Sequence, residues 1–461
     1  MLFRGRFLTA MLLWGLLMAT CVGTAAPAPA PTPERPWIHR YDQTLTMKVM
    51  VALKKPSGGT DVLLSPDQTL EVIKRIDSLT LGIPKIIYLV GWQYDGHDSK
   101  YPAFFEANAG LKRPQDASAL DSLKWLMREA KQYNTTVSVH INLHDAYENS
   151  PLWREYVDHD LLIRGSDGKL LPGAIWGGER SYKVCYTREW DAGYTQKRLD
   201  KLLELLPIEE AGTVHIDAYI TEPCTAQGIS REQETETQRK IYRYLRDRGV
   251  DVTSEFESDQ RIDPLVGLQP MAWWFHPALS EYLQWPASLY VGGVDEGLGG
   301  KLFGISMHGE DIVGNDPERL TGFLHEFCLQ TAPWYFLNRQ ARLKVELTAD
   351  ASTAFFSGGI VTSVDRGGRI TMTEQGRLVR DGSDILVPAL WREERSEIAY
   401  SADGYGGRWW SLPPQWNNAT EVNAAEITLS GLKPLGHIRV SNGKIQLTLI
   451  PDQALLLTLV H

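Results

Sequence analysis

The sequence predicts an α/β protein in which a (β/α)8 barrel of the TIM type precedes a C-terminal all-β sandwich. Residues 44–342 alternate short apolar runs with helical patterns, which indicates parallel strands joined by right-handed crossovers. Residues 343–461 change to short alternating runs separated by Gly, Asp and Asn. No Gly-rich phosphate fingerprint follows the first predicted strand. This absence favours a barrel over a doubly wound sheet.

The N-terminal residues have the pattern of an export signal. Residues 1–26 contain Arg4 and Arg6, then an apolar run, then small residues, which predicts a cleaved signal peptide. The apolar run is too short to favour a membrane span, so none is expected after signal cleavage. Residues 27–43 form a Pro-rich spacer. We therefore expect a periplasmic or extracellular protein, and the residues before Cys21 match a lipid-anchoring site poorly.

Composition excludes some partners. The chain carries 57 acidic and 47 basic residues, for a formal charge of −10. This balance does not favour nucleic acid as a partner. Trp (15) outnumbers Phe (12), and Trp is common both in large cores and at wet binding surfaces. Cys185, Cys224 and Cys328 remain after signal cleavage, so one disulfide at most can form, and its pairing stays open.

The barrel elements follow from hydrophobic periodicity. Strands are predicted at 44–53, 85–92, 136–142, 212–219 and 250–256. Helices are predicted at 66–80, 116–133, 192–206 and 231–248. Later units are less regular, with a strand and loop at 302–311 and a helix at 317–329. In the C-terminal region, Asn442-Gly443 predicts a tight β-hairpin.

Three successive barrel strands become polar on one face near their C-terminal ends. Because side chains alternate along a strand, this face points into the barrel while the apolar face packs on helices. The inward residues are Ser138, His140, Asn142, His215, Asp217, Tyr219, Thr253 and Glu255. Such residues can form a buried hydrogen-bond network, but barrel enzymes place their active sites at this end. We therefore predict an active site there, with Asn142 and Tyr219 among its substrate-binding residues.

Asp217 and Glu255 are the predicted catalytic pair. They end consecutive strands, which lie about 4.8 Å apart in a parallel sheet. That spacing suits the carboxyl separation of about 5–5.5 Å found in retaining glycoside hydrolases. The shorter Asp217 is the predicted nucleophile, and Glu255 is the predicted acid/base. Glu257 has the same strand parity and remains a rival acid.

Loops at the barrel mouth supply further candidates. His97 and Asp98 follow the second strand and are predicted to contact sugar hydroxyls, although Asp98 also suits a turn that bonds its own backbone. Trp176 lies between glycines in an insertion and suits stacking on a sugar ring. A lone Trp is more often a core residue.

Metal chemistry is the main alternative. His140 and His144 form an H-x-x-x-H pattern that suits a metal-dependent carbohydrate deacetylase or amidohydrolase. Positions four apart on a strand are about 13 Å apart, so only a sharp turn would join them on one ion. We therefore expect no metal and no cofactor. A barrel that binds carbohydrate without turnover is a third hypothesis.

Several motifs together resemble a known family. "YLVGWQYDGHDSKYP", "VSVHIN", "VHIDAY" and "TSEF" resemble the catalytic barrel of the endo-α-N-acetylgalactosaminidases, glycoside hydrolase family 101. "GGRWWSLPPQW", "AEITLSGL" and "IRVSNGKIQLTL" look like that family's β-module. The resemblance covers about residues 44–460, although the chain is much shorter than members of the family.

The resemblance implies a function and site roles. Family members release Galβ1-3GalNAc from the α-linked Ser or Thr of mucin-type O-glycans, with retention. Carried over by position, Asp217 is the nucleophile and Glu255 the acid/base. His97, Asp98 and His140 are sugar contacts, and Trp176 is an aromatic platform. The expected partner is an O-glycan or glycopeptide, and both endo cleavage and exo release of GalNAc remain open.

Overall fold

The computed structural model describes residues 37–255, 271–273, 278–284 and 297–460. The predicted signal peptide, most of the spacer, and Glu257 lie outside these residues. Among the described residues, the model contains no helix with the length and apolarity needed to cross a membrane.

The first part of the chain is built on a parallel sheet whose strands follow one another in chain order. The sheet runs β1-β4-β5-β9-β10-β11, and each pairing is parallel. Its strands are β1 (Leu45–Met50), β4 (Lys85–Val90), β5 (Thr135–Asn142), β9 (Thr213–Asp217), β10 (Asp251–Glu255) and β11 (Met271–Trp273). Strands in chain order with helical crossovers are typical of a curved barrel wall.

The opposite edge of β1 is also paired. The backbone N–H of Lys48 donates to the carbonyl of His308 at 2.8 Å, so His308 lies beside β1. The prediction placed a strand and loop at 302–311, but Leu302 and Phe303 belong to helix α9 (Leu298–Phe303). Gly304, with φ 82°, ends that helix because only glycine adopts this conformation at little cost.

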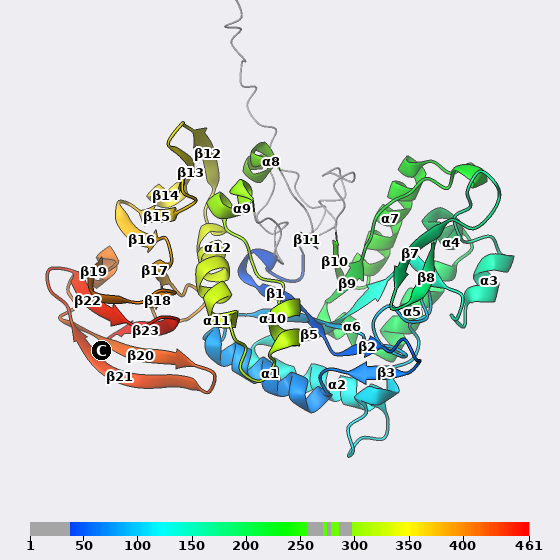
Figure 1. Ribbon diagram of the computed structural model, residues 1–461, viewed down its shortest axis with the longest axis horizontal. Helices are drawn as coiled ribbons and strands as arrows, with labels where there is room; N and C mark the ends of the chain where they lie inside the picture. The colour runs from blue at the N-terminus through cyan, green and yellow to red at the C-terminus, as the bar shows by residue number, and fades with distance from the viewer. Residues whose placement is uncertain (1–36, 256–270, 274–277, 285–296, 461) are drawn as a thin grey trace, which may run out of the picture.

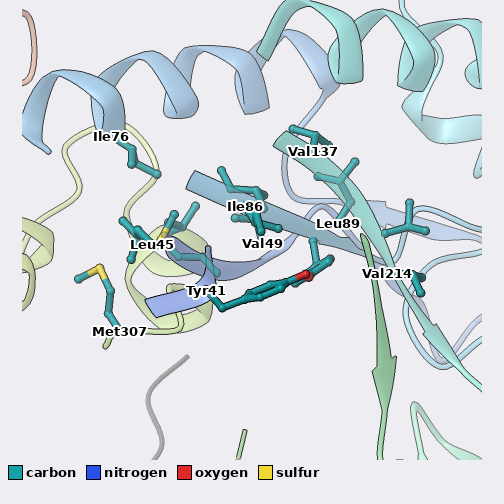
Figure 2. Close-up of a cluster of buried hydrophobic side chains, with 14 of the residues drawn as sticks. Tyr41, Leu45, Val49, Ile76, Ile86, Leu89, Val137, Val214 and Met307 are labelled. Carbon is teal, nitrogen blue, oxygen red and sulfur yellow. The ribbon is translucent and has the colours of Figure 1, made fainter. Parts of the chain in front are cut away.

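Helices cover the outer face of the sheet, as Figure 1 shows for α1 and α2. Those between the strands are α1 (Pro66–Leu79), α2 (Ala119–Glu129), α5 (Tyr194–Leu205), α6 (Ile208–Ala211) and α7 (Arg231–Arg246). Ser65 and Ser230 begin α1 and α7 with capping boxes, in which side chain and backbone exchange hydrogen bonds. In Figure 2, Ile76 reaches from α1 towards the strands, whereas Tyr41 lies on their other side.

An insertion and a hairpin surround the carboxyl ends of the strands. The insertion contains β6 (Asp145–Tyr147), α3 (Trp153–Asp158), β7 (Pro172–Trp176), β8 (Glu179–Lys183) and α4 (Tyr186–Asp191). The hairpin contains β2 (Ala52–Lys54) and β3 (Thr60–Val62). Lys54 and Glu179 form an ion pair that joins the two.

Shorter helices lead to the C-terminal part. They are α8 (Leu279–Gln284), α9, α10 (Glu310–Asn315), α11 (Phe323–Glu326) and α12 (Ala332–Leu337). The helix predicted at 317–329 starts later, at Phe323, and a π-helical stretch over Phe327–Thr331 continues it into α12. Gly322 at φ 83° marks this later start.

The C-terminal strands form one large antiparallel sheet and a small ribbon, on the left of Figure 1. The ten-stranded sheet contains β12 (Arg342–Leu347), β13 (Ala351–Phe356), β14 (Ile360–Asp365), β15 (Ile370–Glu374), β16 (Arg377–Asp381), β17 (Asp384–Pro388), β18 (Ser396–Ser401), β23 (Gln453–Leu459), β20 (Glu421–Thr428) and β21 (Gly431–Arg439). The ribbon pairs β19 (Tyr405–Ser411) with β22 (Lys444–Leu449). The predicted sandwich is therefore unequal, with a two-stranded layer against a ten-stranded one.

A second apolar core joins the ribbon to the sheet. Trp410 and Trp416 are buried there with Leu386 and Leu457. Trp409, the neighbour of Trp410 in β19, is 53% exposed, because neighbouring residues of a strand face opposite ways. The predicted hairpin at Asn442-Gly443 is confirmed, with both residues at positive φ.

Candidate active site

Strand register brings the predicted catalytic residues into one layer. Asn142 of β5 lies opposite Asp217 of β9. Ser254 of β10 lies opposite Ile216, so Glu255 follows in register beside Asp217. The two carboxylates therefore end neighbouring parallel strands, as the sequence predicts.

The layer below confirms which face points inward. The ring of His215 lies 5.2 Å from that of His140 and 5.4 Å from that of Tyr88. Its Nδ1 is 2.9 Å from the hydroxyl of Thr253. Contacts among four different strands need side chains that converge inside the curved sheet. The predicted inward direction of His140, His215 and Thr253 is thus confirmed.

Asp217 is held by two neighbours from β5. Asn142 Nδ2 donates to Asp217 Oδ2 at 3.2 Å, and His140 Nε2 lies 3.6 Å from Oδ1. Burial alone would raise the pKa of Asp217, but the His140 imidazole and the Lys48 ammonium outweigh it and hold that pKa well below its usual range. Asp217 is therefore ionised at neutral pH, as a nucleophile must be.

Glu255 has a different environment. Its Oε1 lies 2.5 Å from the Nζ atom of Lys48, which also lies 3.1 Å from Glu310 Oε1. Burial and the charge of Asp217 raise the pKa of Glu255, although Lys48 opposes them in part. The two neighbouring carboxyl groups thus have pKa values shifted in opposite directions, the pattern expected of an acid and a nucleophile.

The sequence interpretation missed Lys48. It lies on β1, and the carboxylates of Glu255 and Glu310 outweigh burial and raise its pKa. A lysine inside an otherwise apolar strand was the available signal, since lysine is seldom fully buried without a partner. Glu310 is the first residue of α10, and the sequence around it carries no specific motif.

Asn142, which the sequence predicts to bind substrate, orients neighbouring protein groups, and its contact with a sugar stays a prediction. Its side chain is buried; Oδ1 accepts the backbone N–H groups of His144 and Asp145, while Nδ2 donates to Asp145 and Asp217. Both ends of the amide are occupied by protein. Asp145 is therefore linked to Asp217 through Asn142.

His97 and Asp98 lie beside the catalytic layer. Their side chains approach at 3.3 Å, and the His97 ring is 5.4 Å from that of His140. Burial, with the charges of Asp217 and Asp145, raises the pKa of Asp98 to about 8. Burial and the His140 charge lower the pKa of His97 to about 4. Both groups are thus mainly neutral at pH 7, and Asp98 can donate a hydrogen bond.

The predicted position of Tyr219 is wrong. Its ring is buried between Tyr186 of α4 and Tyr242 of α7, at centroid distances of 5.2 and 5.4 Å. The chain turns at Ala218, which has φ 40°, so strand alternation no longer applies one residue after Asp217. Tyr219 therefore packs among helices instead of facing the barrel mouth.

Trp176 is exposed at the end of a hairpin. Its side chain is 48% exposed beside the Gly177-Gly178 turn, so it is not a core residue. Its strand partner Glu179 pairs with Lys54, and Leu53 bridges to His97. These links tie the Trp176 hairpin to the loop that carries His97.

The predicted metal ligands do not converge. His144 contacts Tyr186 and lies 3.9 Å from Glu222, whereas His140 faces Asp217. In the described part of the chain, two clusters near the site have ligand atoms within 4.8 Å of one another. One contains His140, His215 and Glu255, and the other contains His97, Asp98 and Asp217. The pairing of His140 with His144 on one ion is therefore wrong.

Comparisons with known proteins agree with this geometry. A family model described as endo-α-N-acetylgalactosaminidase matches residues 57–265. A protein of Renibacterium salmoninarum named "Putative endo-alpha-N-acetylgalactosaminidase" is 24% identical over 423 residues, which are 85% of this chain. The chain is therefore similar to the endo-α-N-acetylgalactosaminidases. It spans only 25% of that relative's length.

Solved structures of a related glycosidase share the fold. An α-N-acetylgalactosaminidase of Bifidobacterium bifidum in complex with GalNAc superposes with a TM-score of 0.56 at 15% identity, covering 72% of this chain and 58% of that one. Its complex with Gal-NHAc-DNJ gives a TM-score of 0.54 at 14% identity, with the same coverage. The region that the family model matches includes both Asp217 and Glu255.

Proposed function

We propose that this chain is a retaining glycosidase that cleaves α-linked N-acetylgalactosamine, either GalNAc or Galβ1-3GalNAc, from mucin-type O-glycans. The observation that carries the proposal is the pair of adjacent carboxyl groups with opposite pKa shifts, Asp217 lowered and Glu255 raised. Retaining hydrolysis requires one ionised and one protonated carboxyl group on neighbouring positions.

The proposed reaction has two steps. The Asp217 carboxylate attacks the anomeric carbon as Glu255 donates its proton to the departing glycosidic oxygen. Glu255 then accepts a proton from water, and the resulting hydroxide equivalent displaces Asp217 from the glycosyl ester. Two inversions at one carbon give net retention. Lys48 contacts Glu255 and has the position to stabilise its ionised form between the steps.

The substrate assignment rests on the family match and on the polar groups around the carboxylates. A neutral Asp98 and His97 offer a donor and an acceptor for sugar hydroxyls without adding charge near Asp217. Trp176 offers an exposed aromatic face for a sugar ring or its aglycone. We also propose that the six described strands belong to a complete (β/α)8 barrel, which the hydrogen bond from Lys48 of β1 to His308 supports.

The decisive experiment uses aryl glycosides of α-GalNAc and Galβ1-3GalNAc-α. We expect turnover of at least one, with the α-anomer of the released sugar appearing first by NMR. The relative rates separate exo from endo cleavage. Initial release of the β-anomer would exclude the retaining mechanism, and saturable binding without turnover would indicate a carbohydrate-binding barrel instead.

A further inference from the structure

Two buried cysteines from distant parts of the chain lie side by side behind the site. The sulfur atoms of Cys185 and Cys224 and a carboxylate oxygen of Glu234 all lie within 4.8 Å of one another. Both cysteines are completely buried, together with Ile163. They are thiols in this structure, as is Cys328. We propose that Cys185 and Cys224 form a disulfide in the mature protein.

The positions of the two residues give the bond a structural purpose. Cys185 directly precedes α4, and its backbone N–H donates to Leu161 at 2.9 Å. Cys224 lies in the segment that follows Asp217, between β9 and α7. The same segment carries Glu222, which pairs with Lys183 of β8. The disulfide therefore fastens the segment after the candidate nucleophile to the β8–α4 junction.

A metal is a weaker occupant of this cluster. The two oxygens of Glu234 accept backbone N–H groups of Tyr186 and Thr187 at 2.9 Å each, so the carboxylate is already used to hold the start of α4. A structural zinc site usually has four protein ligands. Only the two thiols would remain available as metal ligands, which is too few for such a site, whereas a disulfide needs only two thiols.

The oxidation requires an external disulfide, such as oxidised glutathione, which acts before the cysteines become buried. The thiolate of Cys185 attacks one glutathione sulfur and releases the other as a thiolate. The thiolate of Cys224 then attacks the Cys185 sulfur and releases the second glutathione. Two electrons pass from the cysteine sulfurs to glutathione, whose two thiolates take up the protons. Export, which residues 1–26 predict, would bring the chain to a compartment where such bonds persist.

Peptide mapping tests the pairing directly. The full chain is unfolded with reductant, refolded in a glutathione redox buffer, unfolded again in denaturant without reductant, alkylated and digested with trypsin. We expect the peptide of residues 184–188 to be linked to that of residues 202–231, while the peptide of residues 320–339, with Cys328, is alkylated. If the refolded protein instead yields alkylated Cys185 and Cys224, or if either residue is linked to Cys21 or Cys328, the proposal is overturned.

Thermal unfolding gives a second readout that does not depend on hydrolase activity. Reduction should lower the melting temperature of the oxidised chain by about 5 °C, because the bond restricts the unfolded loop of residues 186–223. The double variant Cys185→Ser/Cys224→Ser should lose this response to reductant. Cys328→Ser, a buried cysteine outside the cluster, should keep it. An equal response in all three proteins would contradict the assignment.

Discussion

The side-chain amide of Asn142 donates to the Oδ2 atom of Asp217 at 3.2 Å and to that of Asp145 at 2.9 Å. Its oxygen is fixed in turn by the backbone N–H groups that open β6. One buried amide thus sets the orientation of the candidate nucleophile. The carboxylate is held before any substrate arrives, which lowers the cost of reaching the transition state.

Replacing the nucleophile should abolish turnover. We expect Asp217→Asn to lower kcat by about 10³-fold or more, because an amide cannot form the glycosyl ester. Hydrolysis of an aryl α-GalNAc substrate measures this. In Asp217→Ala, the space left by the carboxylate should admit azide as an external nucleophile. Azide should then restore part of the rate and give a β-glycosyl azide. Full activity of Asp217→Asn would contradict the proposed mechanism.

Removing the amide that orients Asp217 should reduce catalysis without unfolding the protein. We expect Asn142→Ala to lower kcat by about 10²-fold, since misplacement of a reacting group costs about that much. The acid limb of the pH profile should also move to higher pH, because Asp217 loses a hydrogen bond to its ionised form. Asn108→Ala removes a buried amide outside the site and should leave that limb in place. Identical pH profiles for the two variants would argue against a positioning role.

Lys48 should set the pH range of activity. It lowers the pKa values of both Asp217 and Glu255. We expect Lys48→Met to move both limbs of the kcat/KM profile upward, by about one pH unit. The matched control is Lys85→Met, which removes a buried lysine that pairs with Asp77 on the outer side of the sheet. Lys85→Met should lose stability but keep the pH limits of the wild-type kcat/KM profile. If both variants shifted these limits equally, the shift would be a general effect of destabilisation.

The burial of the Asp98 carboxyl group should lower the stability of the folded protein at high pH. Its folded pKa, about 8, lies above the ordinary value of 3.8. A raised carboxyl pKa favours folding below the ordinary value, and this benefit is lost as the pH rises towards the folded pKa. We therefore expect Asp98→Asn to raise the melting temperature relative to wild type at pH 9, and to do so less at pH 4.

A second buried acid separates this stability effect from sugar binding. Burial raises the pKa of Glu397, in the C-terminal sheet, to about 8 as well. Glu397→Gln should change the pH dependence of the melting temperature without changing KM. Asp98→Asn should change both, because Asp98 lies beside Asp217. An unchanged KM in Asp98→Asn would remove it from the sugar-binding residues.

Chelation should leave the reaction intact. The proposed double displacement uses only carboxyl groups, so dialysis against EDTA should not lower kcat. Metal analysis of the purified protein provides the parallel measurement. If activity fell and zinc restored it, the cluster of His140, His215 and Glu255 would become the candidate metal site.

The local sequence pattern was sufficient to predict which face of each strand points into the curved sheet. Strand side chains alternate with a period of two, so the polar residues of β5, β9 and β10 had to share the inner side once the apolar residues packed on helices. For this reason Asn142, Asp217 and Glu255 were assigned correctly to one layer, and His140 to the inner face of the layer below, beside His215. The rule failed at Tyr219, because the backbone of Ala218 adopts positive φ and the strand ends at Asp217.

Distant contacts were decided by the tertiary structure. Lys48 and Glu255 are 207 positions apart, and no local pattern pairs them. Curvature of the sheet brings β1 and β10 within reach of one ion pair. The protonation of Asp98 likewise depends on burial and on the charges around it. By itself the sequence therefore determined which face of each strand its residues occupy, whereas the packed structure decided their partners and charge states and added Lys48 and Glu310 beside Glu255.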